Sequence, residues 1–104
     1  MIDVDPEHEG EFNEWYEKEH LPERVTAPGF LSARRFVAVQ GEPKYLALYD
    51  LDSPEAIESP EYKKINTPSE WTKKIRAHYR KFVRNVYVEL VPDPHGMRRA
   101  IDQE

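Results

Sequence analysis

The chain has 104 residues, which suffices for one domain but leaves too little polypeptide to bury two separate cores. Its formal net charge of -5 argues against nucleic acid as the main partner, because binding phosphates needs a basic surface. The absence of cysteine excludes disulfides, thiolate metal ligands and cysteine catalysis.

The N-terminal region predicts a short strand followed by a helix. Residues 2–4 alternate apolar and polar side chains, which is typical of a strand. Asp5 and Pro6 then form a helix start, an N-cap acceptor followed by proline at the first helical position. Pro22 disfavours helical geometry at the residue before it, so we expect this helix to end near His20.

A β-hairpin is predicted next. Pro28 and Gly29 interrupt the regular pattern. Residues 30–39 then have the composition of a long strand, residues 41–43 that of a tight turn, and residues 44–51 that of a second long strand. We expect these two strands to pair antiparallel.

The C-terminal half predicts a second helix and a last strand. Thr67 and Pro68 open the helix, with Glu70 placed to complete a capping box. The apolar spacing continues this helix to Phe82, and residues 83–91 follow as a strand that prolines end.

The predicted order is therefore β-α-β-β-α-β. This order is typical of an α+β, ferredoxin-like fold, in which two helices pack on one face of a four-stranded antiparallel sheet. We assign residues 1–92 to this domain and residues 93–104 to a polar C-terminal tail that is free to move.

Both faces of the predicted sheet are apolar. Alternation places Phe30 and Phe36 on one face of their strand, and the opposite face carries Leu31, Ala33, Val37 and Val39. The partner strand likewise has tyrosines on one face and Leu46 and Leu48 on the other. Two helices cover one face only, and exposing the second costs about 25 cal/mol per Å². We therefore expect a homodimer in which a second sheet covers the open face.

The strongest candidate site lies in the first helix. Phe12, Tyr16 and His20 fall at four-residue steps on one ridge, with Trp15 beside them. Imidazole transfers protons near neutral pH, so a histidine at the end of an aromatic ridge is a candidate general acid or base. The structural alternative is that Trp15 and Tyr16 belong to the core and His20 caps the helix.

The pattern Trp15-Tyr16-x-x-x-His20-x-Pro22, followed by Pro28-Gly29-Phe30 at the start of a strand, resembles the EthD-like branch of the dimeric α/β-barrel superfamily. The element order and the segment Ser59-Pro60-Glu61-Tyr62 extend the resemblance over nearly the whole chain. It implies a dimer whose two sheets close a barrel, with a pocket between helices and sheet that His20 faces. The superfamily includes cofactor-free cyclases, dehydratases, isomerases and monooxygenases, and also haem-degrading enzymes. The first strand is short for this superfamily.

Two adjacent arginines, Arg34 and Arg35, interrupt an otherwise apolar strand. They point to opposite faces, so one of them faces inward, where an unpaired charge is costly. The inward arginine either pairs with a carboxylate such as Asp50 or Glu89 or binds an acidic or carbonyl-bearing substrate. Further candidates for the substrate pocket, each also compatible with a place in the core, are Trp15, Tyr16, Tyr49, Trp71 and Tyr87.

The sequence offers no sign of a metal, a cofactor or a membrane. The four histidines lack the spacing of a metal site, and the four glycines form no phosphate-binding loop. No apolar run approaches the roughly 20 residues of a membrane-spanning helix, and the acidic start does not resemble a secretory signal. We expect a soluble cytoplasmic protein without a metal or cofactor.

The leading hypothesis is a cofactor-independent enzyme of cyclase, isomerase, dehydratase or monooxygenase type, acting on an aromatic, polyketide-like or lactone substrate. In it, His20 is the general acid or base, and Arg34 or Arg35 stabilises developing negative charge. One alternative is a non-enzymatic dimeric module that binds a small ligand. Another is a haem-binding or haem-degrading protein that uses Trp71 or His78.

Overall fold

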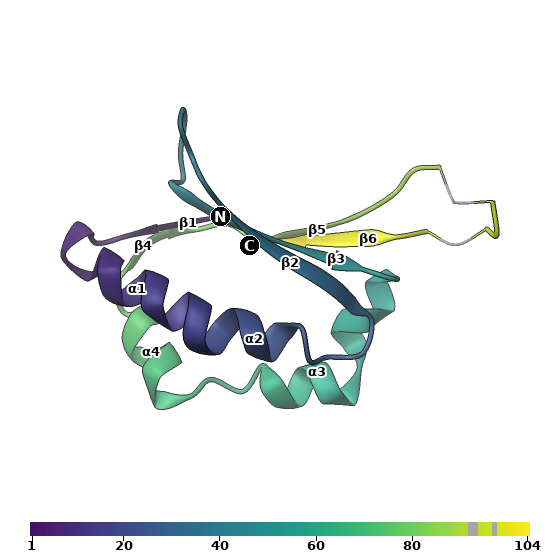
Figure 1. The fold of residues 1–104 in the computed structure, drawn as a ribbon, viewed down its shortest axis with the longest axis horizontal. Coiled ribbons are helices and arrows are strands. Elements are labelled where there is room, and N and C mark those ends of the chain that lie inside the picture. Colours follow the sequence, from purple (N-terminus) through teal and green to yellow (C-terminus); the bar gives the residue numbers. More distant parts are fainter. Residues whose placement is uncertain (92–93, 97) are drawn as a thin grey trace.

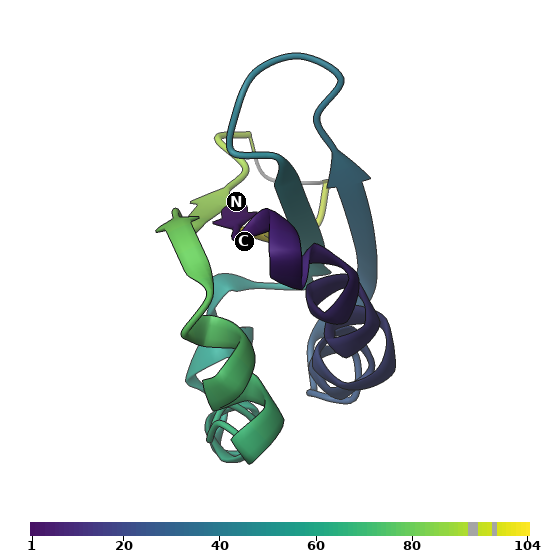
Figure 2. The same ribbon diagram turned by 90° about the vertical axis from the view of Figure 1, so that its left-hand side faces the viewer.

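The computed structural model describes residues 1–91, 94–96 and 98–104 and confirms the predicted α+β class. The helices lie against one face of an antiparallel sheet (Figures 1 and 2). The strands are β1 (Ile2–Val4), β2 (Phe30–Val37), β3 (Tyr45–Leu51), β4 (Tyr79–Phe82), β5 (Asn85–Val88) and β6 (Ala100–Gln103). The helical segments are η1 (Pro6–His8), α1 (Glu9–Trp15), η2 (Tyr16–His20), α2 (Leu21–Arg24), η3 (Pro54–Glu58), α3 (Pro60–Ile65) and α4 (Glu70–Arg76).

Over the described residues the sheet has six strands, where the sequence predicted four. Its order is β4-β1-β3-β6-β5, with β2 paired to β3, and every pairing is antiparallel. β1 and β6 pair with different parts of β3, since Ile2 lies opposite Tyr45 and Gln103 lies opposite Leu48. The two ends of the described chain therefore meet near the middle of the sheet (Figure 1).

The end of the chain differs most from the prediction. Residues 100–103, expected in a mobile polar tail, form β6 between β3 and β5, with Ala100 and Asp102 buried. Glu104 extends the pairing, because its N–H donates to the carbonyl of Ala47 at 2.8 Å and its carbonyl accepts the N–H of Ala47 at 3.2 Å. The segment is ordered because backbone hydrogen bonds on both sides hold it, in spite of its polar composition.

The second helix ends earlier than predicted. α4 ends at Arg76, six residues before the predicted end at Phe82, and the residues that follow form β4. In β4, Phe82 lies opposite Ile2 of β1. β4 thus occupies the predicted end of the helix, and the predicted last strand, residues 83–91, contains β5 alone. Apolar residues at Tyr79 and Phe82 fit the spacing of a helix as well as that of a strand end, so the pattern alone did not separate the two.

The caps of the two later helices are serines. Ser69 caps α4, its Oγ accepting the N–H of Thr72 at 3.1 Å, whereas Thr67 was the predicted cap. Ser59 caps α3 in the same way, accepting the N–H of Tyr62 at 3.0 Å. The helix start was therefore predicted two residues too early, because either hydroxyl suits the role.

The first helix extends beyond its predicted end at His20 as far as Arg24. Its middle part, η2, is π-helical, and the N–H of Leu21 donates to the carbonyl of Tyr16. This turn shifts the hydrogen-bond ladder just before Pro22, which has no N–H to donate. The helix thus passes through the proline, and it places the side chain of His20 in its interior rather than at its end.

A β-bulge at the start of β2 changes which residues face the helices. The register shifts between Phe30 and Ser32, which leaves Leu31 as an extra residue. Phe30 is buried toward the helices, whereas Phe36 lies opposite Leu46 and is 44% exposed. The prediction that both phenylalanines share one face is therefore wrong, because strict alternation fails at a bulge.

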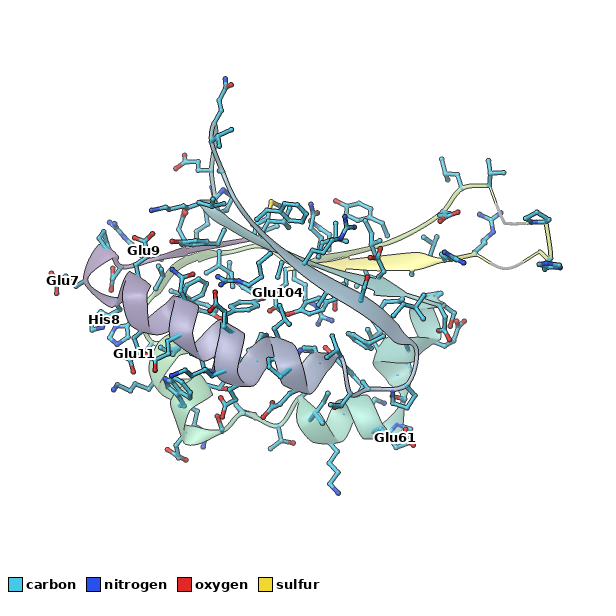
Figure 3. All side chains as sticks on the ribbon, in the orientation of Figure 1. Glu7, His8, Glu9, Glu11, Glu61 and Glu104 are labelled. Carbon is cyan, nitrogen blue, oxygen red and sulfur yellow. The ribbon has the colours of Figure 1, made fainter. Side chains whose placement is uncertain are left out.

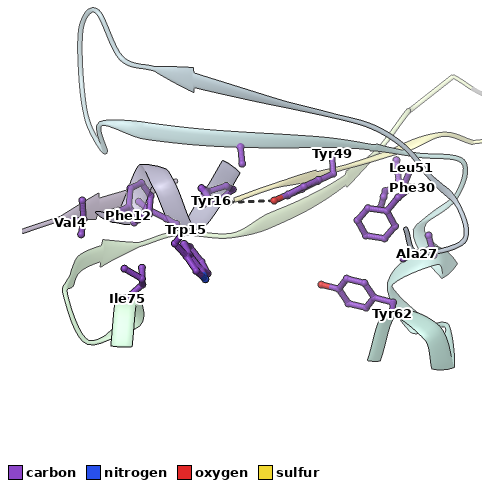
Figure 4. Packing of buried hydrophobic residues seen from close by; sticks show 14 residues of the cluster. Val4, Phe12, Trp15, Tyr16, Ala27, Phe30, Tyr49, Leu51, Tyr62 and Ile75 are labelled. Carbon is purple, nitrogen blue, oxygen red and sulfur yellow. Dashed lines mark hydrogen bonds between the residues drawn. The ribbon is translucent and has the colours of Figure 1, made fainter. Parts of the chain in front are cut away.

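The core lies between the sheet and the helices (Figure 4). The first helical region, from η1 to α2, contributes three fully buried side chains, Phe12, Trp15 and Tyr16. Tyr49 of β3 packs from the side of the sheet. Phe12 and Tyr16 pack edge to face with their ring centroids 5.5 Å apart. The other buried apolar residues are Ile2, Val4, Ala27, Phe30, Ala47, Leu51, Ala56, Tyr62, Ile75 and Ala100.

Gly29 joins the first helical region to β2 and has no room for a side chain. Its φ is +86°, and a Cβ there would lie 2.7 Å from Asp52 Oδ1 and 2.8 Å from Ala56 Cβ. We expect Gly29→Ala to lower the free energy of unfolding by about 2 kcal/mol. Gly10→Ala, in α1 with open space around it, should instead raise it by about 0.5 kcal/mol. Urea unfolding curves of the two variants check this, and a neutral Gly29→Ala would contradict it.

Candidate functional site

Three polar side chains meet in the core between the first helical region and the sheet. His20 Nε2 lies 2.7 Å from Glu104 Oε1, and the Tyr16 hydroxyl donates to the same oxygen at 2.5 Å. His20 is 3% exposed, Tyr16 is 1% exposed and Glu104 is 7% exposed. Figure 3 shows Glu104 between the helix and the sheet. The carboxylate that follows β6 is therefore held by two groups of η2.

The ionisation of this cluster follows from its contacts. Burial acts to raise the pKa of Glu104, but the hydrogen bond and charge of His20, the bond from Tyr16 and the charge of Arg24 outweigh it and lower that pKa to about 2. Burial and the nearby Glu104 raise the pKa of Tyr16 well above its ordinary value, so its hydroxyl stays protonated. Because Glu104 is an ionised acceptor, Nε2 of His20 carries the hydrogen of their bond.

The imidazole ring of His20 is fixed by two aromatic neighbours. Trp15 stacks on it with ring centroids 4.4 Å apart at 27°, and Tyr16 contacts it edge to face at 4.9 Å. The indole N–H of Trp15 in turn donates to Glu19 Oε2 at 2.9 Å and to Thr72 Oγ1 at 3.1 Å. The ring orientation of His20 is thus tied to the contact between the first helical region and α4.

Tyr16 is enclosed from the sheet side as well. The hydroxyl of Tyr49 donates to that of Tyr16 at 3.4 Å, and burial followed by the charge of Glu104 raises the pKa of Tyr49. The Arg35 guanidinium lies 4.4 Å from the centroid of the Tyr16 ring and donates to Asn13 Oδ1 at 2.8 Å. Both residues hold Tyr16 in place rather than reaching His20.

A cavity of about 350 Å³ lies beside His20 and Glu104. Its walls also include the aromatic rings of Tyr79 and Phe82 and three arginines, Arg24, Arg76 and Arg84. The cavity is thus lined by an imidazole bonded to a carboxylate, by two aromatic rings and by three guanidinium groups.

Arg84 forms an ion pair with the buried carboxylate of Asp102. Its Nε donates to Asp102 Oδ1 at 3.0 Å and its Nη2 to Asp102 Oδ2 at 2.6 Å, while Nη2 also reaches the Tyr62 hydroxyl at 3.1 Å. Asp102 is 1% exposed, so this bidentate pair fixes β6 beside the cavity.

The predicted site residues do not gather in one place. Of the seven predicted site residues, His20 lines the cavity, and Trp15, Tyr16 and Tyr49 lie behind it in the core. Arg35 faces the helices, but Arg34 lies on the uncovered face of the sheet, 3.5 Å from Asp50. Trp71 packs half-buried at the edge of the core. Arg34, Arg35 and Trp71 are thus not among the described lining residues of this cavity.

A second cavity, of about 420 Å³, lies on the uncovered face of the sheet. Its lining combines apolar residues with polar and charged ones: Leu31, Leu51, Tyr87, Val88, Ala100 and Ile101 beside Ser32, Asp50, Glu89 and Arg99. Tyr87, which was expected in the same cavity as Tyr49, belongs to this one instead.

Sequence reasoning missed two important residues of the first cavity. Arg24 continues the four-residue ridge of Phe12, Tyr16 and His20, a signal that was lost because the helix was expected to end at His20. Glu104 carried no such signal. A strand is recognised by apolar residues on its buried face, but the buried face of this last segment bears mostly carboxylates.

Two further features concern metals and membranes. His8 and His78, although distant in sequence, stack with ring centroids 3.4 Å apart. Within residues 1–91, 94–96 and 98–104, no cluster of three or more histidine and carboxylate side chains is arranged to hold a metal ion. Over the same residues, every helix is too short or too polar to cross a bilayer.

Comparison with known proteins gives one result. A family model described as a domain of unknown function (DUF4286) matches residues 1–75. Neither a curated protein nor a solved structure matches the chain.

Proposed function

The chain belongs to the DUF4286 family of domains of unknown function, and we propose that it is a cofactor-independent enzyme in which His20 transfers a proton on a small molecule held in the adjacent cavity. The substrate is an aromatic, polyketide-like or lactone compound, and the reaction is a cyclisation, isomerisation, dehydration or oxygenation. The observation that carries this proposal is the contact of His20 Nε2 with ionised Glu104 at 2.7 Å, beside a cavity that both residues line.

The proposed reaction requires a His20 ring whose only hydrogen is on Nε2, so that Nδ1 accepts a proton from the carbon next to a substrate carbonyl. Glu104, bonded to the Nε2–H, stabilises the imidazolium that forms, and the pair resembles the base and orienting carboxylate of other proton-transfer sites. The electron pair of the broken C–H bond moves onto the carbonyl oxygen as an enolate. In an isomerisation, His20 then returns the proton to another atom of the substrate, which closes the cycle.

The dimensions and lining of the cavity support a small aromatic substrate. A volume of about 350 Å³ lies within the roughly 300–1,000 Å³ usual for ligand pockets. Tyr79 and Phe82 offer ring surface, and the arginines offer stabilisation for the enolate oxygen.

The test is exchange of carbon-bound hydrogen in heavy water. We expect the protein to accelerate loss of the α-proton signal from members of a panel of 1,3-dicarbonyl compounds and lactones, followed by proton NMR. His20→Gln should lower this acceleration by about 100-fold or more, because general acid–base catalysis contributes roughly 10²–10⁴.

His78→Gln is the matched control, since His78 stacks on His8 outside the cavity. If His20→Gln is folded by circular dichroism and exchanges the α-proton as fast as the wild type does, His20 is not the base. The same holds if the protein accelerates no exchange across the panel.

A specific observation favours a second candidate, a non-enzymatic module that binds a small ligand. His20 is only 3% exposed and is stacked on Trp15, which suits a fixed hydrogen-bonding residue as well as a base. Binding in the cavity without any proton exchange is the result that distinguishes this function.

We also propose that the protein works as a homodimer through the uncovered face of the sheet, as in a ferredoxin-like α/β barrel. Leu31 is 54% exposed and Phe36 is 44% exposed on this side, together with Tyr87 at 50%. Apolar surface of this extent on one sheet face supports a second copy as its cover. Light scattering at micromolar concentration should return twice the mass of one chain, and the mass of a single chain would contradict the dimer.

A further inference from the structure

Arg24 has an unusual environment for a charged side chain. It is 3% exposed, and its guanidinium lies 5.4 Å from the centroid of the Tyr62 ring. Nη2 donates to Asn66 Oδ1 at 2.9 Å, but Nε is buried without a hydrogen-bond partner among the described residues. Buried polar atoms are rarely left unpaired in native proteins, so this guanidinium has an N–H donor that no described residue accepts.

The charges around the cavity do not balance within the described chain. Asp102 neutralises Arg84, and Glu104 is bonded to His20 and Tyr16. Across residues 1–91, 94–96 and 98–104, the ion pairs found involve no carboxylate bound to Arg24 or to Arg76. The cavity therefore holds an excess of positive charge. Arg24 is the more buried of the two arginines that have no carboxylate partner in the described chain, and burying its charge without an anion is unfavourable.

We propose that the cavity binds a small organic acid through its carboxylate, with Arg24 as the principal binding residue and Arg76 as a second cation at the cavity wall. A planar carboxylate matches the geometry of a guanidinium group. Its two oxygens would accept two parallel hydrogen bonds from N–H groups of Arg24 that are not bonded to Asn66. Tyr79 and Phe82 then contact the apolar part of the acid. This inference rests on the proposed function in making the acid the substrate on which His20 acts.

The test is calorimetric titration of the 104-residue chain with benzoate and with phenylpyruvate, each paired with its neutral methyl ester, and with inorganic phosphate. We expect the carboxylates to bind at least about tenfold more tightly than their esters and than phosphate, because a charge-assisted bidentate contact is lost in the esters. Esters that bind as tightly as the acids would overturn the proposal, and so would phosphate bound in preference to both carboxylates or a failure of both acids to bind.

Substitutions locate the binding residue. Arg24→Gln should weaken carboxylate binding by about tenfold or more, and Arg24→Lys should fall between this variant and the wild type, since ammonium lacks the planar fork. Arg80→Gln is the control of equal charge change, because Arg80 lies outside the cavity beside Asp5. Arg24 is not the binding residue if a folded Arg24→Gln binds the carboxylates as tightly as the wild type does. The same holds if Arg80→Gln weakens carboxylate binding by the same factor as Arg24→Gln. If Arg24→Gln does not fold, Arg76→Gln and the comparison of acid with ester in the wild type decide.

The proposed anion site and the proposed enzyme activity can be refuted independently of each other. Carboxylate binding that persists in His20→Gln and in a protein without exchange activity supports the anion site and refutes the proposed enzyme. Exchange with neutral dicarbonyl compounds, together with equal binding of acids and esters, supports the enzyme and refutes the anion site.

Discussion

We expect Arg84→Met to lower the free energy of unfolding by about 3–5 kcal/mol, because it removes the guanidinium that pairs with the buried carboxylate of Asp102. Asp102 is 1% exposed, and Arg84 donates a hydrogen bond to each of its two carboxylate oxygens. Methionine keeps much of the length and apolar character of the arginine stem, so the loss reports the charge pair rather than packing. Denaturant unfolding at neutral pH measures the effect.

Arg34→Met is the matched control. Arg34 lies 3.5 Å from Asp50, and both side chains are substantially exposed, so water replaces the contact. We expect a loss below about 1 kcal/mol. Equal effects of the two substitutions would contradict the burial of Asp102, and with it the place of β6 between β3 and β5.

We expect acid to weaken the fold through Glu104, and this is the second large effect. Its pKa is about 2 in the folded protein, below the ordinary value of 4.5. A carboxyl whose folded pKa is depressed stabilises the fold above its unfolded pKa and loses that contribution as the pH falls through the folded one. We therefore expect about 2–3 kcal/mol of stability to disappear between pH 4.5 and 2.

Glu104→Gln separates this contribution from that of other carboxylates. The variant should be less stable than the wild type at neutral pH, and the two should converge as the pH approaches 2. Parallel unfolding free energies across this range, with a constant difference, would mean that Glu104 does not titrate as the contacts require. Thermal or urea unfolding at a series of pH values provides the comparison.

Much of the fold could be predicted from apolar spacing. The hairpin of β2 and β3 and the first helix follow from patterns in which apolar residues repeat at the period of the element. Two of the failures share a cause, because each occurs where backbone hydrogen bonding departs from the regular period. The bulge near Leu31 reverses the faces of β2, and the π-turn before Pro22 lets a helix continue past its predicted end.

The candidate site was predictable only in part. His20 and Tyr16 stood out because an aromatic ridge and an imidazole share one helix face. Glu104 did not, since it is far away in the sequence and its burial depends on partners from η2 and β3. A buried carboxylate is stable only when its hydrogen bonds are satisfied, and no local pattern records where such distant donors lie.

The contact between His20 and Glu104 is best tested by long-range proton–nitrogen NMR of the His20 ring. An ionised acceptor at Nε2 requires a hydrogen on that nitrogen, whether or not Nδ1 is also protonated. We predict an Nε2–H signal pattern for His20 in the wild type. A ring that instead carries its hydrogen on Nδ1, with Nε2 bare, would show that Glu104 does not accept from His20, and the proton-transfer site described above would not exist.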